Sequence, residues 1–324
     1  MAPEDDNYKA RKFQGPEFIP ANVGFMPVTW KKHREALEEI VLRHPVICGP
    51  HQKGSVNFDA PGDGTYRQGE HVDEWGCVWS NVCEGYEAYV SGHPLPRREM
   101  VRDLRPPPPG AGHSYGILPH GFLFLRLTYL RGYEEIMLDF AEEPPELQRL
   151  IDIVLDYNAG ELKQLLARPP ELQYFGDDLG TQRSLPISPE TWRKYLKPCY
   201  AKLYRMCHDA GTDVYMHSDG HIIPIIKYLI ECGVDVLNVQ ARANGLRRLA
   251  EECRGKVCVS LDLDDQMLPF ATPEEIDAHV RECVETLALP QGGLCLLSAC
   301  GPDVPLANIE AVCQAMEKYR GYFR

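Results

Sequence analysis

The chain has 324 residues, of which 44% are hydrophobic and 25% are charged. This composition is that of an ordinary globular protein with ample apolar material for a core. The formal net charge of −13 argues against nucleic acid or an anionic membrane surface as a partner, because both attract clustered lysine and arginine.

Several features predict a cytoplasmic protein. The acidic residues at the N-terminus are not followed by the apolar segment of a signal peptide. No stretch approaches the roughly 18 uninterrupted apolar residues of a membrane span. The 12 cysteines include no CxxC pair and lie mostly in apolar segments, which is typical of buried, reduced thiols.

The first hundred residues are irregular. Residues 18–26 form a possible strand, and apolar residues at helical spacing predict a helix over 30–44. Residues 72–79 resemble a half-buried strand or turn, whose tryptophans Trp75 and Trp79 we expect to pack this segment against the rest of the fold. The proline run within 105–112 ends this elaboration, and we do not interpret it as a hinge between independent domains.

Strand and helix patterns alternate regularly further along the chain. Strands are predicted at residues 172–176, 213–217, 234–239, 257–261 and 294–298, and helices at 132–140, 144–166, 188–210, 221–231, 244–254, 273–288 and 305–319. Short connections between continuous apolar strands and helices indicate parallel strands joined by helical crossovers.

This alternation predicts an α/β fold, a (β/α)8 TIM-type barrel. Less clear strands near residues 20, 46 and 120 bring the expected number of strands to eight. The absence of a GxGxxG turn after the first strand argues against an open doubly wound sheet. We therefore expect one barrel domain over residues 1–324, with an irregular N-terminal elaboration within residues 1–110.

Catalytic groups of such barrels lie after the carboxyl ends of the strands. The candidates there are His217, Asp219 and Cys300, which could bind zinc with one position open to substrate. Other roles remain open from spacing alone. His217 could bond a neighbouring carboxylate, Asp219 could cap the following helix, and Cys300 could simply pack before a glycine turn.

Three further polar residues follow strand ends. Asp177 or Asp178 could act as an acid or base or anchor a substrate, since neighbouring carboxylates separate each other's pKa values. Alternatively, Asp178 caps a turn and Asp177 pairs with Arg183. Gln240 could orient a ligand or satisfy backbone groups.

Short segments in a fixed order extend this interpretation to a family. They are Asp73-Glu-Trp-Gly76, Leu130-Arg-Gly-Tyr-Glu134, Asp177-Asp-Leu-Gly180, Ile187-Ser-Pro-Glu190, His217-Ser-Asp-Gly220, Gly233-Val-Asp235 and Gly301 to Ile309. From about residue 70 onwards, the chain resembles the uroporphyrinogen decarboxylase superfamily. This superfamily includes cobalamin-dependent methyltransferases on the same barrel.

The resemblance favours the methyltransferase branch. Residues 24–33 lack the paired arginines with which the decarboxylase binds its porphyrinogen carboxylates. The methyltransferases hold zinc with a His-x-Cys pair and a distant Cys-Gly. This chain keeps His217 and Cys300 but has Asp219 in place of the middle cysteine. The resemblance thus implies His217, Asp219 and Cys300 as metal ligands.

The implied function is zinc-dependent transfer of a methyl group from a small O-methylated compound, aromatic ones included, to cobalamin or a corrinoid protein. Replacing a thiolate by a carboxylate makes zinc a harder Lewis acid, which suits polarisation of an ether oxygen. Asp177 or Asp178 and Gln240 would orient the substrate. A homodimer is an option, because superfamily members are often dimers.

Two other function classes stay open. One is a metal-free decarboxylase of a small carboxylated substrate, with Arg126, Arg131 and Arg183 as candidate anchors. The other is a non-catalytic ligand-binding barrel.

Overall fold

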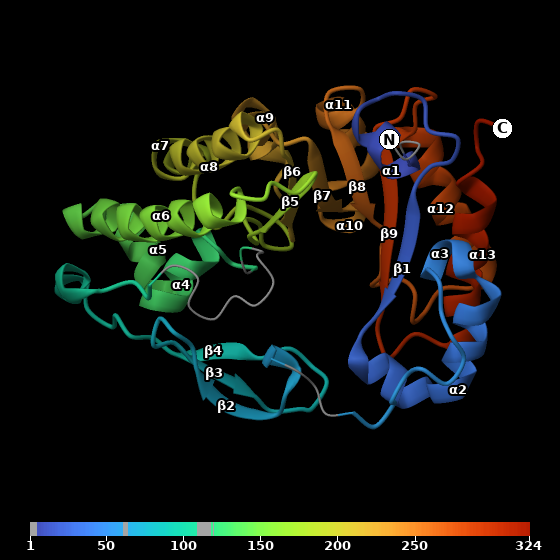
Figure 1. Cartoon of the computed structure of the whole chain (residues 1–324), viewed down its shortest axis with the longest axis horizontal. Helices are drawn as coiled ribbons and strands as arrows, with labels where there is room; N and C mark the ends of the chain where they lie inside the picture. The colour runs from blue at the N-terminus through green and yellow to red at the C-terminus, as the bar shows by residue number, and fades with distance from the viewer. Residues whose placement is uncertain (1–4, 61–63, 109–117, 119) are drawn as a thin grey trace. The chain divides into compact units, whose positions relative to one another are not determined.

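The computed structural model describes residues 5–60, 64–108, 118 and 120–324. Tertiary contacts divide the chain into two units, and Figure 1 labels the helices and strands of both. Unit 1 comprises residues 1–69, 81–88 and 239–324, and unit 2 comprises residues 70–80 and 89–238. The expected organisation as one barrel domain stays a prediction.

Unit 1 is built on parallel strands in the order β1-β9-β8, namely β1 (Ala21–Phe25), β9 (Leu294–Cys300) and β8 (Cys258–Asp262). Its helices are α1 (Asp6–Arg11), α2 (Pro27–Arg43), α3 (Pro45–Cys48), α10 (Ala241–Asn244), α11 (Leu246–Cys253), α12 (Pro273–Leu287) and α13 (Leu306–Tyr319), with a 3-10 turn η1 (Gly64–Tyr66). Strand β8 is buried over its first four residues, because helices cover the sheet.

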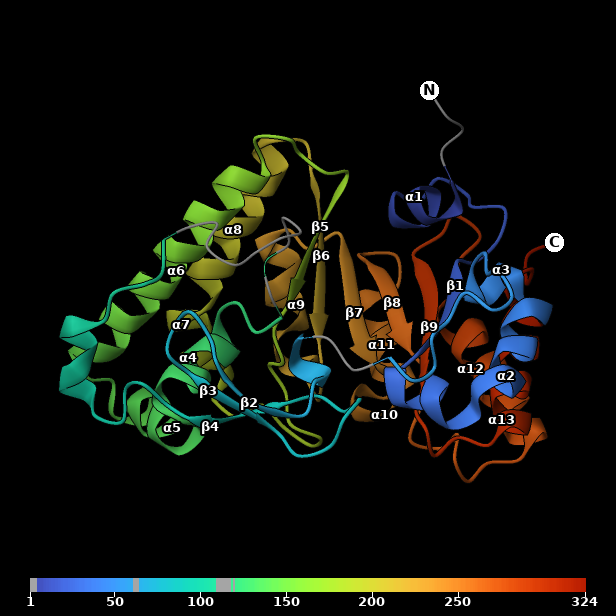
Figure 2. The same ribbon diagram turned by 60° about the horizontal axis from the view of Figure 1, so that its bottom comes forward.

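Unit 2 contains the parallel pair β5 (Leu172–Gly176) and β6 (Asp213–Ser218), which run side by side in Figure 2. Strand β7 (Val236–Gln240) begins in this unit, and the boundary between the units lies inside it. The helices are α4 (Phe124–Arg131), α5 (Tyr133–Glu142), α6 (Pro145–Leu165), α7 (Pro189–Tyr195), α8 (Lys197–Asp209) and α9 (Ile223–Cys232). A small sheet has the order β2 (Gly69–Val72), β3 (Val78–Asn81) and β4 (Tyr89–Gly92), and a 3-10 segment η2 (Arg98–Asp103) follows it.

The predicted α/β class is confirmed, and each regular strand from residue 172 onwards lies within about two residues of its expected position. Two of the weaker strand predictions are wrong. The segment near residue 46 is the short helix α3, which Pro45 starts at its first position. The described residues near 120 form bends that lead into helix α4, and Gly121 has a φ of 75°, which is incompatible with a regular strand.

Asp73 organises the turn between β2 and β3 in unit 2. Its carboxylate accepts hydrogen bonds from the backbone N–H of Cys77 at 2.8 Å and from Nε1 of Trp79 at 3.0 Å. It also pairs with Arg126 of helix α4 at 2.8 Å. Trp75 is buried against Tyr157. Trp79 contacts Tyr129, so the two tryptophans pack residues 72–79 onto the helices of unit 2.

Among the described residues, no helix is long and apolar enough to cross a membrane.

Candidate functional site

The ends of β5 and β6 bring the candidate residues of unit 2 together. The two strands are parallel and in register, with Gly176 opposite His217. The ladder continues one step further, since the N–H of Asp177 donates to the carbonyl of His217 at 3.1 Å. Residues 177–178 and 217–219 therefore lie at one edge of the sheet, as the parallel arrangement predicts.

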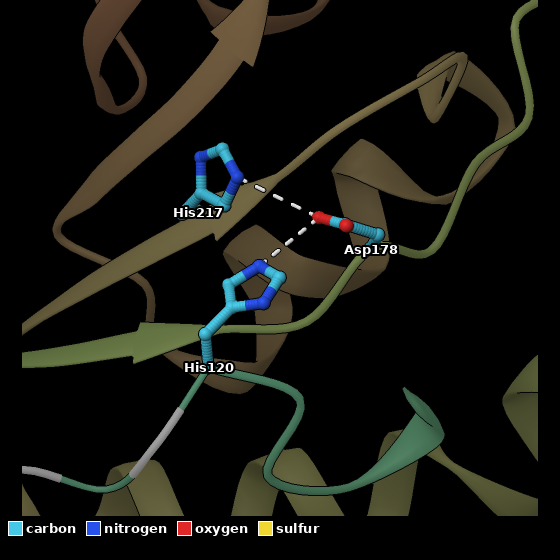
Figure 3. Close-up of side chains that lie close together, drawn as sticks. All are labelled: His120, Asp178 and His217. Carbon is cyan, nitrogen blue, oxygen red and sulfur yellow. Dashed lines mark hydrogen bonds and ion pairs between the residues drawn. The ribbon is translucent and has the colours of Figure 1, made fainter. Parts of the chain in front are cut away.

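A cluster of two imidazoles and one carboxylate forms at this edge (Figure 3). Oδ1 of Asp178 lies 3.2 Å from Nε2 of His120 and 3.5 Å from Nε2 of His217. The two rings are 5.4 Å apart between their centroids, and both face the carboxylate from the same side. Asp178 is thus the shared partner of both histidines.

His120 reaches the cluster from the segment that precedes helix α4. The N–H of Gly121 donates to the carbonyl of Gly176 at 2.7 Å, which fixes this segment to the end of β5. The imidazole occupies the space beside Gly176, where a Cβ would lie 2.5 Å from Cδ2 of His120. Gly176 is therefore needed because a side chain there would collide with the ring.

His217 is oriented from its other side by Asn238. Its Nδ1 lies 2.5 Å from the amide oxygen of Asn238, which can only accept a hydrogen bond. Nδ1 therefore carries a proton, and Nε2 points toward Asp178 and toward Oδ1 of Asp219, which is also 3.5 Å away. In the neutral ring, the free lone pair is on Nε2.

The charges in the cluster support one another. Burial opposes the charged form of His217, but the hydrogen bond to Asp178 and the charge of Asp219 raise its pKa to about 9. The hydrogen bond to Asp178 also raises the pKa of His120. In Asp178, the histidines outweigh burial and hold the pKa well below its ordinary value, whereas burial raises the pKa of Asp219. The carboxylates of the cluster therefore favour the protonated, positively charged form of the two imidazoles.

Asp177 has surroundings unlike those of its neighbour Asp178. Its side chain is fully buried and accepts from the N–H groups of Phe124 and Leu125 at 2.5 and 2.8 Å and from the hydroxyl of Tyr200 at 2.6 Å. Phe124 and Leu125 open helix α4, so the carboxylate satisfies the free N–H groups of that helix end. Burial raises the pKa of Asp177 to about 6 despite these donors.

The loops after β5 and β6 approach each other closely through their backbones at Gly180 and Gly220. A Cβ on Gly220, whose φ is 79°, would lie 2.3 Å from the carbonyl of Gly180. The loops are further joined by hydrogen bonds from Gly180 N–H to the carbonyl of Asp219 at 3.3 Å and from His221 N–H to the carbonyl of Thr181 at 2.7 Å. This contact explains the Asp-Leu-Gly and Ser-Asp-Gly segments of the sequence and fixes the loops that carry Asp178 and Asp219.

The other candidate residues belong to unit 1. Gln240 ends strand β7 and is half-buried. Cys300 ends strand β9 and is fully buried, and burial raises the pKa of its thiol to about 12. The expected ligand set His217, Asp219 and Cys300, and the expected catalytic roles of Asp177, Asp178 and Gln240, stay predictions.

His120 is the residue that sequence reasoning did not place in the site. It precedes a helix rather than following a strand, so no strand-end rule points to it. Its position depends on the contact between Gly121 and Gly176, which is a tertiary interaction. The one nearby sequence feature that indicates a turn at His120 is Gly121, whose φ is positive in the structure.

Unit 1 contains a cavity of about 830 Å³. Its lining includes the half-buried Asp265, whose carboxyl accepts from the hydroxyl of Ser298 at 2.6 Å and from the N–H of Ala299 at 2.9 Å. Burial raises the pKa of Asp265 to about 7, and the charges of Asp262 and Asp264 add to the shift.

Comparison with known proteins gives a family and a shared fold. The family model described as uroporphyrinogen decarboxylase (URO-D) matches residues 124–319. A search of curated proteins found no match. Among solved structures, a methyltransferase from Methanosarcina mazei aligns with a TM-score of 0.64 at 15% identity, covering 97% of this chain and 98% of that one.

A second solved structure aligns less well. It is a B12-independent methionine synthase from Shewanella sp. W3-18-1, with a TM-score of 0.42 at 12% identity over 77% of this chain and 72% of that one. Only the first of these two structural likenesses is close enough to indicate a common fold.

Proposed function

Because the chain belongs to the uroporphyrinogen decarboxylase family, we propose that it is a zinc-dependent methyltransferase. Its reaction would move a methyl group from a small O-methylated compound to a corrinoid cofactor or a corrinoid protein. The shared fold with the Methanosarcina mazei methyltransferase, over nearly the whole length of both chains, supports this reaction class within the family. The observation that carries the proposal is His217, held by Asn238 with its Nε2 facing two carboxylates.

The donors around His217 fit a zinc ion. Imidazole nitrogen and carboxylate oxygen are both ordinary zinc ligands, and Nε2 of His217 and Oδ1 of Asp219 lie 3.5 Å apart at the strand ends. When bound, zinc would supply a Lewis acid that polarises the ether oxygen of a methyl donor. Asn238 would fix the ring of His217 in the tautomer that binds metal, a common arrangement around metal-bound histidines.

The protein groups would contribute positioning. Asp178 faces the imidazoles and is partly accessible, so it is better placed than the fully buried Asp177 to contact what the site binds. Gln240 remains a proposed orienting residue.

The decarboxylase alternative has less support in unit 2. A carboxylated substrate needs cationic anchors, but Arg126 is paired with Asp73 at 2.8 Å and Arg131 with Asp139 at 2.8 Å. Both guanidinium groups are buried and serve the packing of helix α4. Arg183 is exposed. A non-catalytic barrel is also less attractive, because strongly shifted pKa values gathered at strand ends are typical of functional sites.

The test supplies the purified protein with reduced cobalamin and a series of small aryl and alkyl methyl ethers. We expect methylcobalamin, seen by its absorbance, together with the demethylated product, seen by chromatography. His217→Ala should lower the rate more than about 100-fold, because it removes a proposed metal ligand. Release of carbon dioxide from carboxylated compounds without cobalamin, and no methylcobalamin, would contradict the proposal.

A further inference from the structure

We infer that His120 and Asp178 bind the metal ion together with His217, so that unit 2 by itself provides three protein ligands. This inference deepens the proposed function and rests on its requirement for a metal, because it names the residues that hold the ion. The sequence motifs pointed instead to Asp219 and Cys300 as the partners of His217.

The spacing of the donor atoms fits one ion. One ligand atom from each of His120, Asp178 and His217 lies within 4.8 Å of the others. Two of the three separations are 3.2 and 3.5 Å, measured from Oδ1 of Asp178 to the two Nε2 atoms. Ligands about 2.1 Å from a tetrahedral zinc ion are separated by roughly 3.4 Å. Both separations from Asp178 therefore match the edge of such a tetrahedron before any ion is added.

The direction of the donors also fits. Both histidines present Nε2 to the same carboxylate oxygen, as Figure 3 shows. Asn238 engages Nδ1 of His217, which leaves Nε2 for the metal. The site is supported by the backbone, because Gly121 bonds to Gly176 and because Gly176 leaves room for the ring of His120. The loops around the cluster are thus arranged to hold both imidazoles.

The number and type of ligands point to a catalytic zinc site. Three protein ligands with a fourth position for substrate or water are usual for such sites, and two histidines with one carboxylate are a common set. Asp219, with Oδ1 3.5 Å from Nε2 of His217, lies close enough to that nitrogen to bind the same ion. Cys300 belongs to unit 1 and is fully buried, and the ligand set of unit 2 does not include it.

The experiment measures zinc binding by the full-length protein. Zinc content after purification and zinc affinity by competition with a chromophoric chelator are compared for the wild type and for His120→Ala, Asp178→Asn and Cys300→Ser. Circular dichroism checks that each variant is folded. The matched control is His208→Ala, since His208 pairs with Asp235 at 2.8 Å in the same unit but without a second histidine.

We expect one zinc per chain in the wild type, in Cys300→Ser and in His208→Ala. His120→Ala and Asp178→Asn should each lose at least about 100-fold in affinity. Cobalt(II) substituted for zinc should give visible d–d absorption without the near-ultraviolet charge-transfer band of a thiolate ligand. A thiolate band, loss of zinc in Cys300→Ser, or wild-type affinity in folded His120→Ala would overturn the inference.

The inference and the proposed function can fail separately. If the protein binds zinc through His120 and Asp178 but does not methylate cobalamin, the inferred ligand set is correct and the proposed methyltransferase function is wrong. If the protein binds no zinc, the inferred ligand set is wrong. Methyl transfer by that metal-free protein would then show that the reaction itself does not require zinc.

Discussion

At the scale of single residues, individual side chains, and their absence at glycines, decide where the polar groups of this protein lie. Gly176 and Gly121 admit His120 to the cluster, and Asn238 orients His217. Asp177 and Asp178 are adjacent in sequence, yet one is fully buried at a helix end and the other faces two imidazoles. Neighbouring residues of one type therefore carry separate roles, which can be tested separately.

Gly176→Ala should weaken zinc binding without unfolding the protein. The added Cβ would lie 2.5 Å from the ring of His120, so the ring must move away from Asp178. We expect zinc affinity to fall by about 10-fold or more, measured by chelator competition. Gly24→Ala is the control, because Gly24 is also a strand glycine but has no atom within 4 Å of its added Cβ. Equal affinities in the two variants would contradict this account of the His120 position.

Asp265 should make stability depend on pH. Its pKa in the folded protein is about 7, above the ordinary value of 3.8, so the folded state holds a proton that the unfolded chain releases. This contribution is fully present below pH 4 and is lost as the pH rises from about 4 to about 7, by at most about 4 kcal/mol. Urea unfolding at several pH values should show Asp265→Asn losing less stability over this range than the wild type. Parallel pH profiles for the two proteins would refute the prediction.

At the scale of elements, helix α4 depends on a group that is distant in sequence. The carboxylate of Asp177 binds the first two N–H groups of the helix, and Arg126 on the same helix pairs with Asp73. The helix thus joins the end of β5 to the small sheet of unit 2. Neither contact can be predicted from hydrophobic periodicity in the sequence, since each links segments about 50 residues apart.

Asp177→Ala should therefore destabilise the protein by about 3 kcal/mol, because it leaves buried donors of Phe124, Leu125 and Tyr200 without an acceptor. Ser188→Ala removes an exposed cap of helix α7 and should cost only about 1 kcal/mol. Both values follow from the midpoints of urea unfolding. A loss at Asp177 no larger than that at Ser188 would show that the buried carboxylate contributes little.

At the scale of the whole molecule, the sequence predicted the repeating elements better than the site. An apolar run placed β8, which is buried over its first four residues as a covered parallel strand requires, and β5 and β6 were placed by shorter apolar stretches between helices. The segments near residues 46 and 120 were mistaken for strands, since short apolar runs do not distinguish strand from helix. His217 and Asp178 were found from strand ends, whereas His120 could not be, because only the folded chain brings it to Asp178.

A metal ion held by unit 2 should stabilise the folded chain as a whole. Binding to the folded state alone adds about 2.7 kcal/mol when free zinc is 100 times its Kd. We expect the thermal midpoint to rise with zinc and to fall again with a chelator in the wild type and in His208→Ala. The midpoint of His120→Ala should not respond, and a response equal to that of the wild type would argue for different ligands.

The contact between Gly180 and Gly220 has a consequence for how this enzyme could acquire new substrates. The loops after β5 and β6 meet backbone to backbone, so neither position accepts a side chain without moving the loops that carry Asp178 and Asp219. Variation in these two loops is therefore constrained. Changes of specificity, whether by natural divergence or by directed evolution, should accumulate in other loops while these two glycines stay fixed.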